Sequence, residues 1–172
     1  MNKPTDRTIF QNAWVVPDIE SACMKWVTEL GVGPFFLTDY TPGTFEEITY
    51  RGEPSDLSMK VAIAQAGNVQ IELIEPTTDQ CAYRDSVPEG QMAFHHMCVW
   101  TLDFEADLKY MKSLDYAAAN TGKVGNVEFA YFDTRPLMGC MLEVVTKNEG
   151  TVKRFEEIAR AAHNWDGKDP IR

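Results

Sequence analysis

Long apolar segments are absent from this sequence, and with them the signals for a membrane span or for secretion. No run of about 18 apolar residues occurs, so nothing indicates a membrane-spanning helix. The N-terminal segment MNKPTDRTIFQ also lacks the apolar centre of a signal peptide. We therefore expect a cytoplasmic protein that has no membrane partner.

Basic residues are also few. The chain has 16 Lys and Arg against 26 Asp and Glu, which gives a net charge of −10 at pH 7. No group of Lys and Arg is clustered in a way that would neutralise phosphates. Nucleic acid is therefore not an expected partner.

Cysteines are scarce and scattered. The four of them form no C-x-x-C pair, and they stand at Cys23, Cys81, Cys98 and Cys140. This usage is typical of free thiols in a reducing compartment. It excludes a disulfide framework as the basis of the fold.

What the sequence does contain is a repeat. QNAWVVPDIESACMKWVTEL, which begins at Gln11, and HMCVWTLDFEADLKYMKSLD, which begins at His96, share a polar donor, an alternating apolar run, an Asp seven residues after the donor and an amphipathic stretch. Two later segments also match, VQIELIEP around Glu72 and CMLEVVTK around Glu143. The four donors form two equivalent pairs, which could converge on one divalent cation where the halves meet.

The spacing of the two pairs differs between the halves. Gln11 and His96 are 85 residues apart, whereas Glu72 and Glu143 are 71 apart. The first half must therefore hold about 14 extra residues (85 − 71), and the Pro- and Gly-containing segment 38–56 is the expected place for them.

Periodicity predicts an α+β fold in which a strand, a helix and three strands occur twice. We place module one at about residues 8–76, a linker at about 77–91, module two at about 92–146 and a C-terminal helix, capped by Thr151, at about 151–164. Asp18 and Asp103 are the expected N-caps of the two module helices. The first half offers one strand candidate too many, so we expect residues 41–54 to be partly loop.

These features resemble the vicinal oxygen chelate superfamily, the group of glyoxalases, bleomycin-resistance proteins and dioxygenases. The matching segments are VVPDIE, HHMCVWTLDFEADL, IELIEP and MGCMLEVV, which together cover most of residues 8–146. The resemblance implies a single domain over residues 1–172, in which two paired βαβββ modules form a cleft around a metal ion. It also implies a homodimer, and whether the modules pair within a chain or across the dimer stays open.

Carried over residue by residue, the metal positions of the superfamily fall on Gln11, Glu72, His96 and Glu143. This ligand set resembles that of eukaryotic-type glyoxalase I, whereas the motif layout is nearer to methylmalonyl-CoA epimerase-like proteins, which usually have His at the first position. The ring-cleaving dioxygenases need two His and one Glu for iron(II), so Gln11 argues against their activity. One imidazole and three oxygen donors suit zinc, nickel, cobalt or manganese and leave positions for substrate oxygens.

Such a centre predicts a metal-dependent isomerase, epimerase or lyase. Its small-molecule substrate would be an enolisable carbonyl compound that reacts through a metal-stabilised enolate. We expect Glu143 to be the base that transfers the proton and Glu72 to be its partner on the opposite face. A non-catalytic, bleomycin-resistance-like binding protein is the alternative, followed by a ring-cleaving dioxygenase.

Simpler explanations stay open for the individual residues. Glu72 and Glu143 alternate with apolar neighbours, so either could face solvent, and His95 could replace His96 as the ligand. We prefer His96 because Asp103 follows it by seven residues, as Asp18 follows Gln11.

Weaker candidates for substrate contact are Trp14, Trp100, Asp56, Phe45 and Tyr50. Their aromatic rings favour an apolar or aromatic substrate.

Overall fold

The computed structural model describes residues 7–172; residues 1–6, the start of the N-terminal segment considered above, lie outside this range. The strand, helix and three strands expected for the first half are β1 (Ile9–Val15), α1 (Ile19–Leu30), β2 (Phe36–Tyr40), β5 (Met59–Ala66) and β6 (Val69–Pro76). The side chain of Asp18 accepts a hydrogen bond from the backbone N–H of Ser21, so this Asp caps α1 as expected.

The second half repeats this order. Its elements are β7 (Ala93–Thr101), α2 (Phe104–Ser113), β8 (Ala118–Val124), β9 (Val127–Phe132) and β10 (Met141–Thr146), with a short helix α3 (Arg135–Met138) before the last strand. Asp103 caps α2 through the N–H of Ala106. The expected α+β arrangement of strand, helix and three strands, occurring twice, is confirmed.

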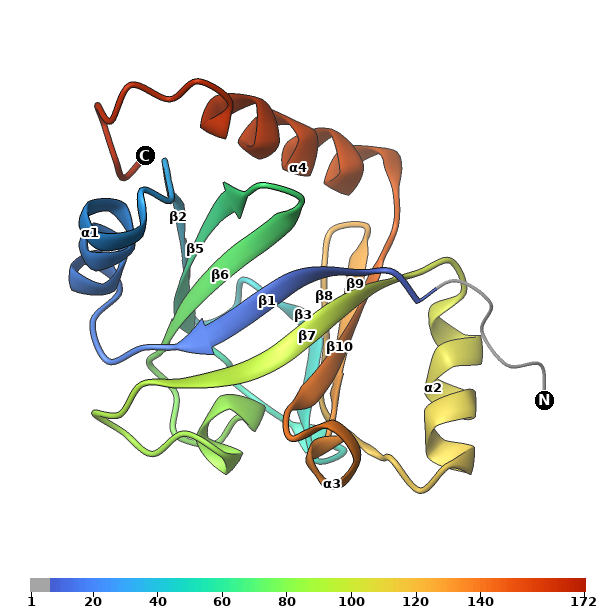
Figure 1. Cartoon of the computed structure of the whole chain (residues 1–172). Helices are drawn as coiled ribbons and strands as arrows, with labels where there is room; N and C mark the ends of the chain where they lie inside the picture. Colours follow the sequence, from blue (N-terminus) through green and yellow to red (C-terminus); the bar gives the residue numbers. More distant parts are fainter. Residues whose placement is uncertain (1–6) are drawn as a thin grey trace.

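All strands belong to one curled sheet, in the order β2-β5-β6-β1-β7-β10-β9-β8-β3-β4. The first strands of the two halves, β1 and β7, run antiparallel side by side at its centre (Figure 1). Each of them pairs in parallel with the last strand of its own half, β6 or β10. The two modules therefore pair within one chain.

The strand register shows that the two halves match residue by residue. Ala13 lies opposite Glu72 in the first half, and Cys98 lies opposite Glu143 in the second. Ala13 and Cys98 are 85 residues apart, as Gln11 and His96 are, and the two glutamates are 71 apart. At the centre, Ala13 lies opposite His96 while Gln11 lies opposite Cys98, as a two-fold relation between the halves requires.

The extra segment of the first half is more ordered than expected. It forms β3 (Glu46–Tyr50) and the short β4 (Glu53–Pro54) where we expected partly loop. β3 does not stay with its own module but pairs with β8 at the far edge of the second. Thr49 lies opposite Thr121, which is 72 residues away in the sequence, so local patterning gives no sign of this pairing.

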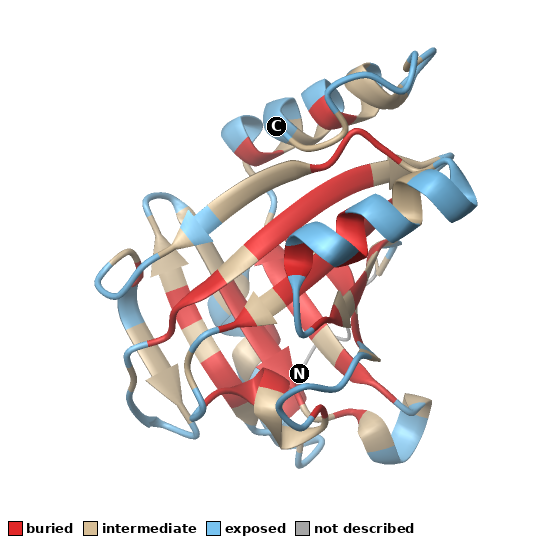
Figure 2. Ribbon diagram, turned by 90° about the vertical axis from the view of Figure 1, so that its left-hand side faces the viewer, coloured by how far each residue is buried: buried red, intermediate tan, exposed pale blue. Residues whose placement is uncertain are grey.

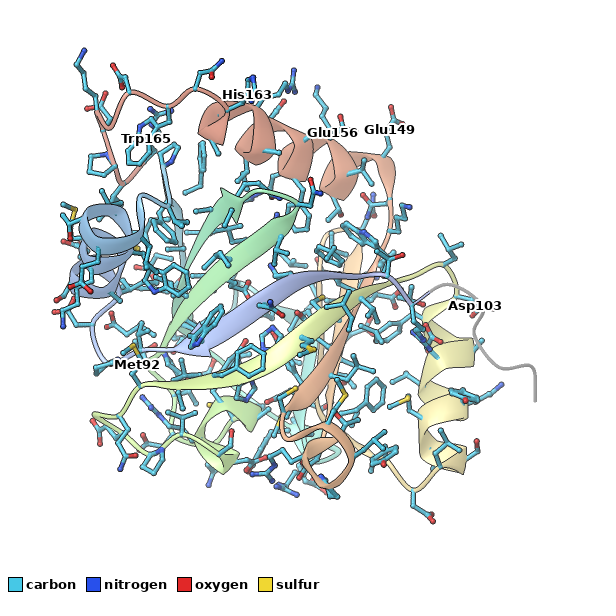
Figure 3. The ribbon with its side chains drawn as sticks, in the orientation of Figure 1. Met92, Asp103, Glu149, Glu156, His163 and Trp165 are labelled. Atoms are coloured by element: carbon cyan, nitrogen blue, oxygen red, sulfur yellow. The ribbon has the colours of Figure 1, made fainter. Side chains whose placement is uncertain are left out.

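The C-terminal helix α4 (Glu149–Ala162) crosses the open side of the curled sheet (Figure 1). It begins two residues earlier than expected because Asn148, rather than Thr151, is its N-cap and accepts a hydrogen bond from the N–H of Thr151. Ile158 is buried on the face of α4 toward the sheet. Glu149, Glu156 and His163 point away from the sheet (Figure 3).

The apolar core lies on both sides of the sheet (Figure 2). One cluster fills the inner side beneath α4, and two smaller clusters pack α1 and α2 against the outer side of their own modules. Within residues 7–172, no helix is both long enough and apolar enough to cross a membrane.

Candidate metal centre

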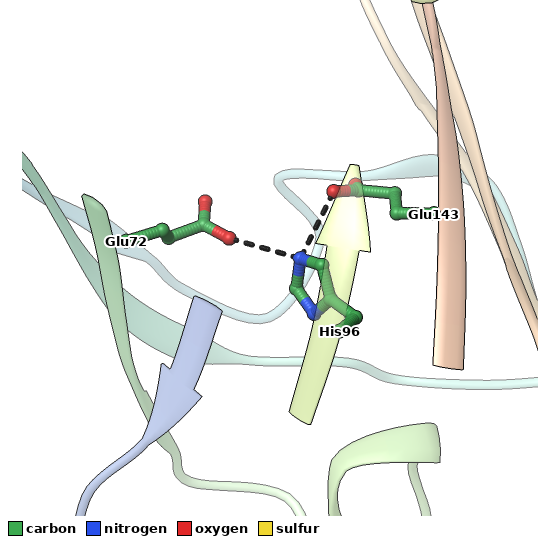
Figure 4. Close-up of side chains that lie close together, drawn as sticks. All are labelled: Glu72, His96 and Glu143. Carbon is green, nitrogen blue, oxygen red and sulfur yellow. Dashed lines mark ion pairs between the residues drawn. The ribbon is translucent and has the colours of Figure 1, made fainter. Parts of the chain in front are cut away.

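Three of the four repeated donors meet on the inner side of the sheet. Nε2 of His96, on β7, lies 3.3 Å from Oε2 of Glu72 on β6 and 3.1 Å from Oε2 of Glu143 on β10 (Figure 4). One ligand atom from each residue lies within 4.8 Å of the other two. Two ligands at about 2.1 Å from one cation, at right angles to each other, are about 3 Å apart, so these distances suit a shared divalent ion.

The sheet explains why the three side chains converge. β6 and β10 lie on either side of the central pair β1–β7, so the two glutamates approach the same point from opposite modules. All three residues are buried, and His96 is 0% exposed. Neither glutamate therefore faces open solvent, which was the simpler explanation for both.

The fourth donor, Gln11, is also buried and lines the same cleft as Glu72 and Glu143. Its Nε2 donates a hydrogen bond of 2.7 Å to Oε1 of Gln70, the residue opposite it on β6. This contact uses the amide nitrogen. The carbonyl oxygen of Gln11 is then the atom that could serve as a ligand.

The neighbouring histidine sets the tautomer of His96. Nε2 of His95 lies 3.1 Å from the carbonyl oxygen of Ala82, which can only accept, so this nitrogen carries the proton. Nδ1 of a neutral His95 is then an acceptor for Nδ1–H of His96, 2.9 Å away. As a result, a neutral His96 presents the bare lone pair of Nε2 to the two glutamates.

This arrangement leaves buried atoms without partners. With His96 neutral, Nε2 of His96 and Oε2 of Glu72 make no hydrogen bond with any described residue. A lone pair directed at two carboxylates is repulsive unless a proton or a cation lies between them. The donor set of one imidazole nitrogen and carboxylate oxygens fits a divalent metal ion.

Without a cation, the cluster takes up protons. Burial opposes the protonation of His96, but Glu143 and Glu72 outweigh it through hydrogen bonding and charge, and they raise the pKa of His96 from 6.5 to about 9. Burial raises the pKa of Glu72, against the opposing effect of His96. Burial, followed by the charge of His96, lowers the pKa of His95 to about 3, which keeps His95 neutral.

Gln11, Glu72 and Glu143 line a cleft of about 250 Å³ between the sheet and α4, and the fully buried His96 contacts both glutamates. The walls of the cleft are mainly apolar and aromatic: Tyr40, Phe45, Met59, Val61, Ile63, Val124, Val127, Phe129, Tyr131 and Val145. The helix α4 contributes Gly150, Thr151, Arg154 and Phe155. Arg154 is the only Lys or Arg among the described residues of this lining, and its guanidinium donates a 2.9 Å hydrogen bond to the hydroxyl of Thr38.

Of the five weaker candidates for substrate contact, Phe45 lies in the cleft wall. Trp14 lies on the outer side of the sheet, where its ring packs against Trp26 and Phe94. Trp100 stacks on Phe10 with 4.1 Å between ring centroids and packs against Phe155 of the cleft, but it does not itself line the cleft.

The other two candidates also lie elsewhere. Tyr50 donates a hydrogen bond to Asp85 at the far edge of the sheet. Asp56 borders a separate shallow depression, and its carbonyl oxygen accepts a hydrogen bond from Thr78. Neither residue contributes to the cleft that holds the glutamates.

Sequence reasoning missed three residues that contact the centre or its cleft: His95 as a partner of His96, Tyr131 beside His96, and Arg154 on α4. The polar segment between the modules was interpreted only as a linker. It in fact forms the 3-10 turn η1 (Ala82–Asp85), which packs behind the centre and provides the carbonyl group that holds His95.

The sequence was compared with protein families and with known proteins. Residues 10–131 match the family described as glyoxalase/bleomycin resistance protein/dioxygenase superfamily. The chain belongs to this superfamily. No curated protein matches its sequence.

Solved structures of the superfamily share the fold at low sequence identity. A hypothetical protein from Bacillus halodurans C-125 is 17% identical with a TM-score of 0.58, over 84% of this chain and 97% of the other. Methylmalonyl-CoA epimerase from Mycobacterium tuberculosis is 14% identical with a TM-score of 0.57, over 89% and 97%. A Streptomyces coelicolor methylmalonyl-CoA epimerase variant is 14% identical with a TM-score of 0.53, over 83% and 96%. Identities this low support the fold alone.

Proposed function

We propose that this superfamily member is a divalent-metal-dependent isomerase, epimerase or lyase that acts on an apolar or aromatic carbonyl compound with an acidic C–H group. The observation that carries the proposal is the buried cluster in which Nε2 of His96 and Oε2 of Glu72 lack hydrogen-bond partners at the floor of an apolar cleft. Glu72, His96 and Glu143 would hold the ion, with the carbonyl oxygen of Gln11 as the fourth donor. Zinc, nickel, cobalt and manganese all suit this set.

The metal would supply Lewis acidity, which lowers the pKa of a C–H group next to a carbonyl. The chain itself supplies the proton acceptors. Glu143 and Glu72 enter the cleft from opposite modules, so their carboxylate oxygens can reach the two faces of one substrate carbon. We assign proton removal to a carboxylate oxygen of Glu143 and the opposite face of the substrate carbon to Glu72.

The cleft supports an apolar substrate. Its aromatic and aliphatic walls exclude water from the carboxylates, which strengthens electrostatic interactions within it. Arg154 on α4 provides one positive charge in the lining, and this favours a substrate that carries an anionic group at the end away from the reacting carbon. A volume of about 250 Å³ accommodates a small molecule or the acyl portion of a larger one.

Metal content tests the centre first. Protein purified without added metal or chelator, or reconstituted afterwards, should contain about one equivalent of a divalent ion by elemental mass spectrometry. The variants Glu72→Ala, His96→Ala and Glu143→Ala should lose it, whereas His163→Ala, which changes an exposed histidine on the outer side of α4, should retain it. Absence of metal after reconstitution would favour a ligand-binding protein without metal chemistry.

Exchange of the acidic proton tests the chemistry without a known substrate. Aryl and alkyl ketones, α-keto acids and acyl thioesters can be incubated with the metal-loaded protein in D2O, and loss of the C–H signal followed by NMR. We expect exchange for at least one aromatic or branched compound, and its loss in Glu143→Gln. Metal binding without exchange in any compound class would contradict enolate chemistry while leaving the metal centre in place.

The homodimer is also a proposal, which light scattering can test.

A further inference from the structure

We propose that Tyr131 donates a hydrogen bond to an oxygen anion of the bound substrate, and that Tyr83, from the segment between the modules, sets the direction of this donation. This inference rests on the proposed function, because it concerns the oxygen that develops charge beside the Glu72, His96 and Glu143 cluster. It adds a catalytic hydrogen-bond donor next to the three residues that would hold the ion.

The position of Tyr131 suits this role. On β9 it lies directly opposite Glu143 of β10, so the two side chains project from neighbouring strands on the same side of the sheet. Its ring centroid lies 4.9 Å from that of His96. Tyr131 also lines the cleft together with both glutamates. A substrate held at the cluster would therefore lie beside this tyrosine.

The hydroxyl of Tyr131 lies 2.9 Å from the hydroxyl of Tyr83, and distance alone does not say which one donates. Access to the cleft decides the direction, because both residues are buried, Tyr83 at 0% and Tyr131 at 3% exposed. Tyr131 lines the cleft and Tyr83 does not, and within residues 7–172 the hydroxyl of Tyr83 has a hydrogen bond only with Tyr131. If Tyr131 were the donor, the proton of Tyr83 would be left in the core without an acceptor, which is costly.

Tyr83 is therefore the donor and Tyr131 the acceptor. The O–H proton of Tyr131 is then free to be donated elsewhere, and Tyr131 borders the cleft, where a substrate oxygen can accept it. A hydroxyl that already accepts one hydrogen bond is also a better donor of the next. An oxyanion in the cleft is the partner that this arrangement favours.

The same 3-10 turn fixes the proton positions of both groups. The carbonyl group of Ala82 places the proton on Nε2 of His95 and so leaves Nε2 of His96 bare, while the next residue, Tyr83, leaves the proton of Tyr131 free. Ala82 is itself held by its N–H, which donates to the side chain of the buried Asn120. The turn thus leaves an unprotonated nitrogen on His96 for a cation and a protonated oxygen on Tyr131 for an anion.

A binding experiment tests Tyr131 without a known substrate. Cobalt(II)-loaded protein is titrated with benzohydroxamate, which presents an anionic oxygen and an aromatic ring, and with imidazole, which binds a metal through nitrogen alone. Visible absorption reports both cobalt uptake and ligand binding. In Tyr131→Phe we expect benzohydroxamate to bind about tenfold or more weakly and imidazole to bind as in the unchanged protein.

Two further variants separate this role from a structural one. Tyr116→Phe alters a tyrosine of the outer cluster under α2 and should leave both affinities unchanged. Tyr83→Phe should weaken benzohydroxamate less than Tyr131→Phe does, because Tyr131 keeps its own proton. Equal affinity of Tyr131→Phe and the unchanged protein for benzohydroxamate, with cobalt uptake intact, would overturn the inference alone. Failure of the unchanged protein to take up cobalt would overturn the proposed function and this inference with it.

A measurement on the unchanged protein covers the case in which Tyr131→Phe does not fold. The zinc-loaded protein is labelled with 13C at tyrosine Cζ. The signal that disappears in Tyr83→Phe belongs to Tyr83, and the signal that shifts because its hydrogen bond is lost belongs to Tyr131. Benzohydroxamate should shift the Tyr131 signal, whereas imidazole should not. A Tyr131 signal that does not respond to bound benzohydroxamate would overturn the inference.

Discussion

Metal affinity should depend steeply on pH between 7 and 9 because of a single imidazole. In the metal-free protein, burial opposes the protonation of His96, but the hydrogen bonds and charges of Glu143 and Glu72 outweigh it and raise its pKa to about 9. A cation can bind only to the unprotonated Nε2. At pH 7 about one imidazole in a hundred is unprotonated, so affinity should increase about tenfold from pH 7 to 8 and about 50-fold from pH 7 to 9.

The sign of the accompanying stability change follows from the same proton. The pKa of His96 is higher in the folded state than its model value of 6.5, so protonation stabilises the metal-free fold fully below pH 6.5, and this contribution is lost as pH rises through about 9. A shift of this size corresponds to about 3 kcal/mol. The raised pKa of Glu72 acts in the same direction, because its ionisation also costs more in the folded protein.

Calorimetric titration with manganese(II) at several pH values measures the effect. Runs at pH 7 in buffers of different ionisation enthalpy should show about one proton released for each ion bound. The control is His163→Ala, whose altered side chain is exposed, and it should give the same slope. An affinity that is flat from pH 7 to 8.5, with no proton released, would show that His96 is already neutral and would refute the reasoning.

Three other predictions follow from single contacts. His95→Phe removes the acceptor for Nδ1–H of His96 and should weaken metal binding by about 10- to 100-fold, with partial recovery in His95→Asn; equal affinity in all three proteins would remove His95 from the centre. Arg154→Gln should weaken the binding of benzoylformate, which carries a carboxylate, by about tenfold while leaving neutral acetophenone unaffected, and equal losses for both ligands would contradict a charge-specific role. Asn120→Ala removes the buried partners of Ala82 N–H and of the Thr49 carbonyl and should lower the free energy of unfolding by about 2–4 kcal/mol in urea; a loss below about 0.5 kcal/mol would mean that both backbone groups find other partners.

The repeated donors could be predicted because two local properties fixed their positions. Side chains alternate between the faces of a strand, and the spacing between the repeated segments is kept in the strand register. The same alternation would have excluded Trp14, which is three residues from Gln11 and so lies on the opposite face. The prediction that Trp14 contacts the substrate depended on its aromatic ring and not on its position in the strand.

Other parts of the site depend on contacts that no local pattern records. The segment around Tyr83 is short, polar and interrupted by Pro and Gly, so its sequence indicates only a connection between modules. Its role arises because it packs behind β7 and β9. Arg154 enters the cleft because α4 crosses the open side of the sheet, and the periodicity of a helix specifies which face is apolar but not where that face docks.

The two halves of the site are equivalent in backbone but not in chemistry, and this asymmetry supports the assignment of roles to the glutamates. Ile63 lies opposite Glu72 in the first module, at the position that Tyr131 holds opposite Glu143 in the second. The first module thus surrounds its glutamate with an aliphatic side chain and the neutral Gln11, and burial raises the pKa of Glu72. The second module places Tyr131 opposite Glu143, while the imidazole of His96 contacts both glutamates. In the proposed reaction, Glu143 therefore acts next to a side chain that can donate a hydrogen bond, and Glu72 acts from the aliphatic side of the substrate carbon.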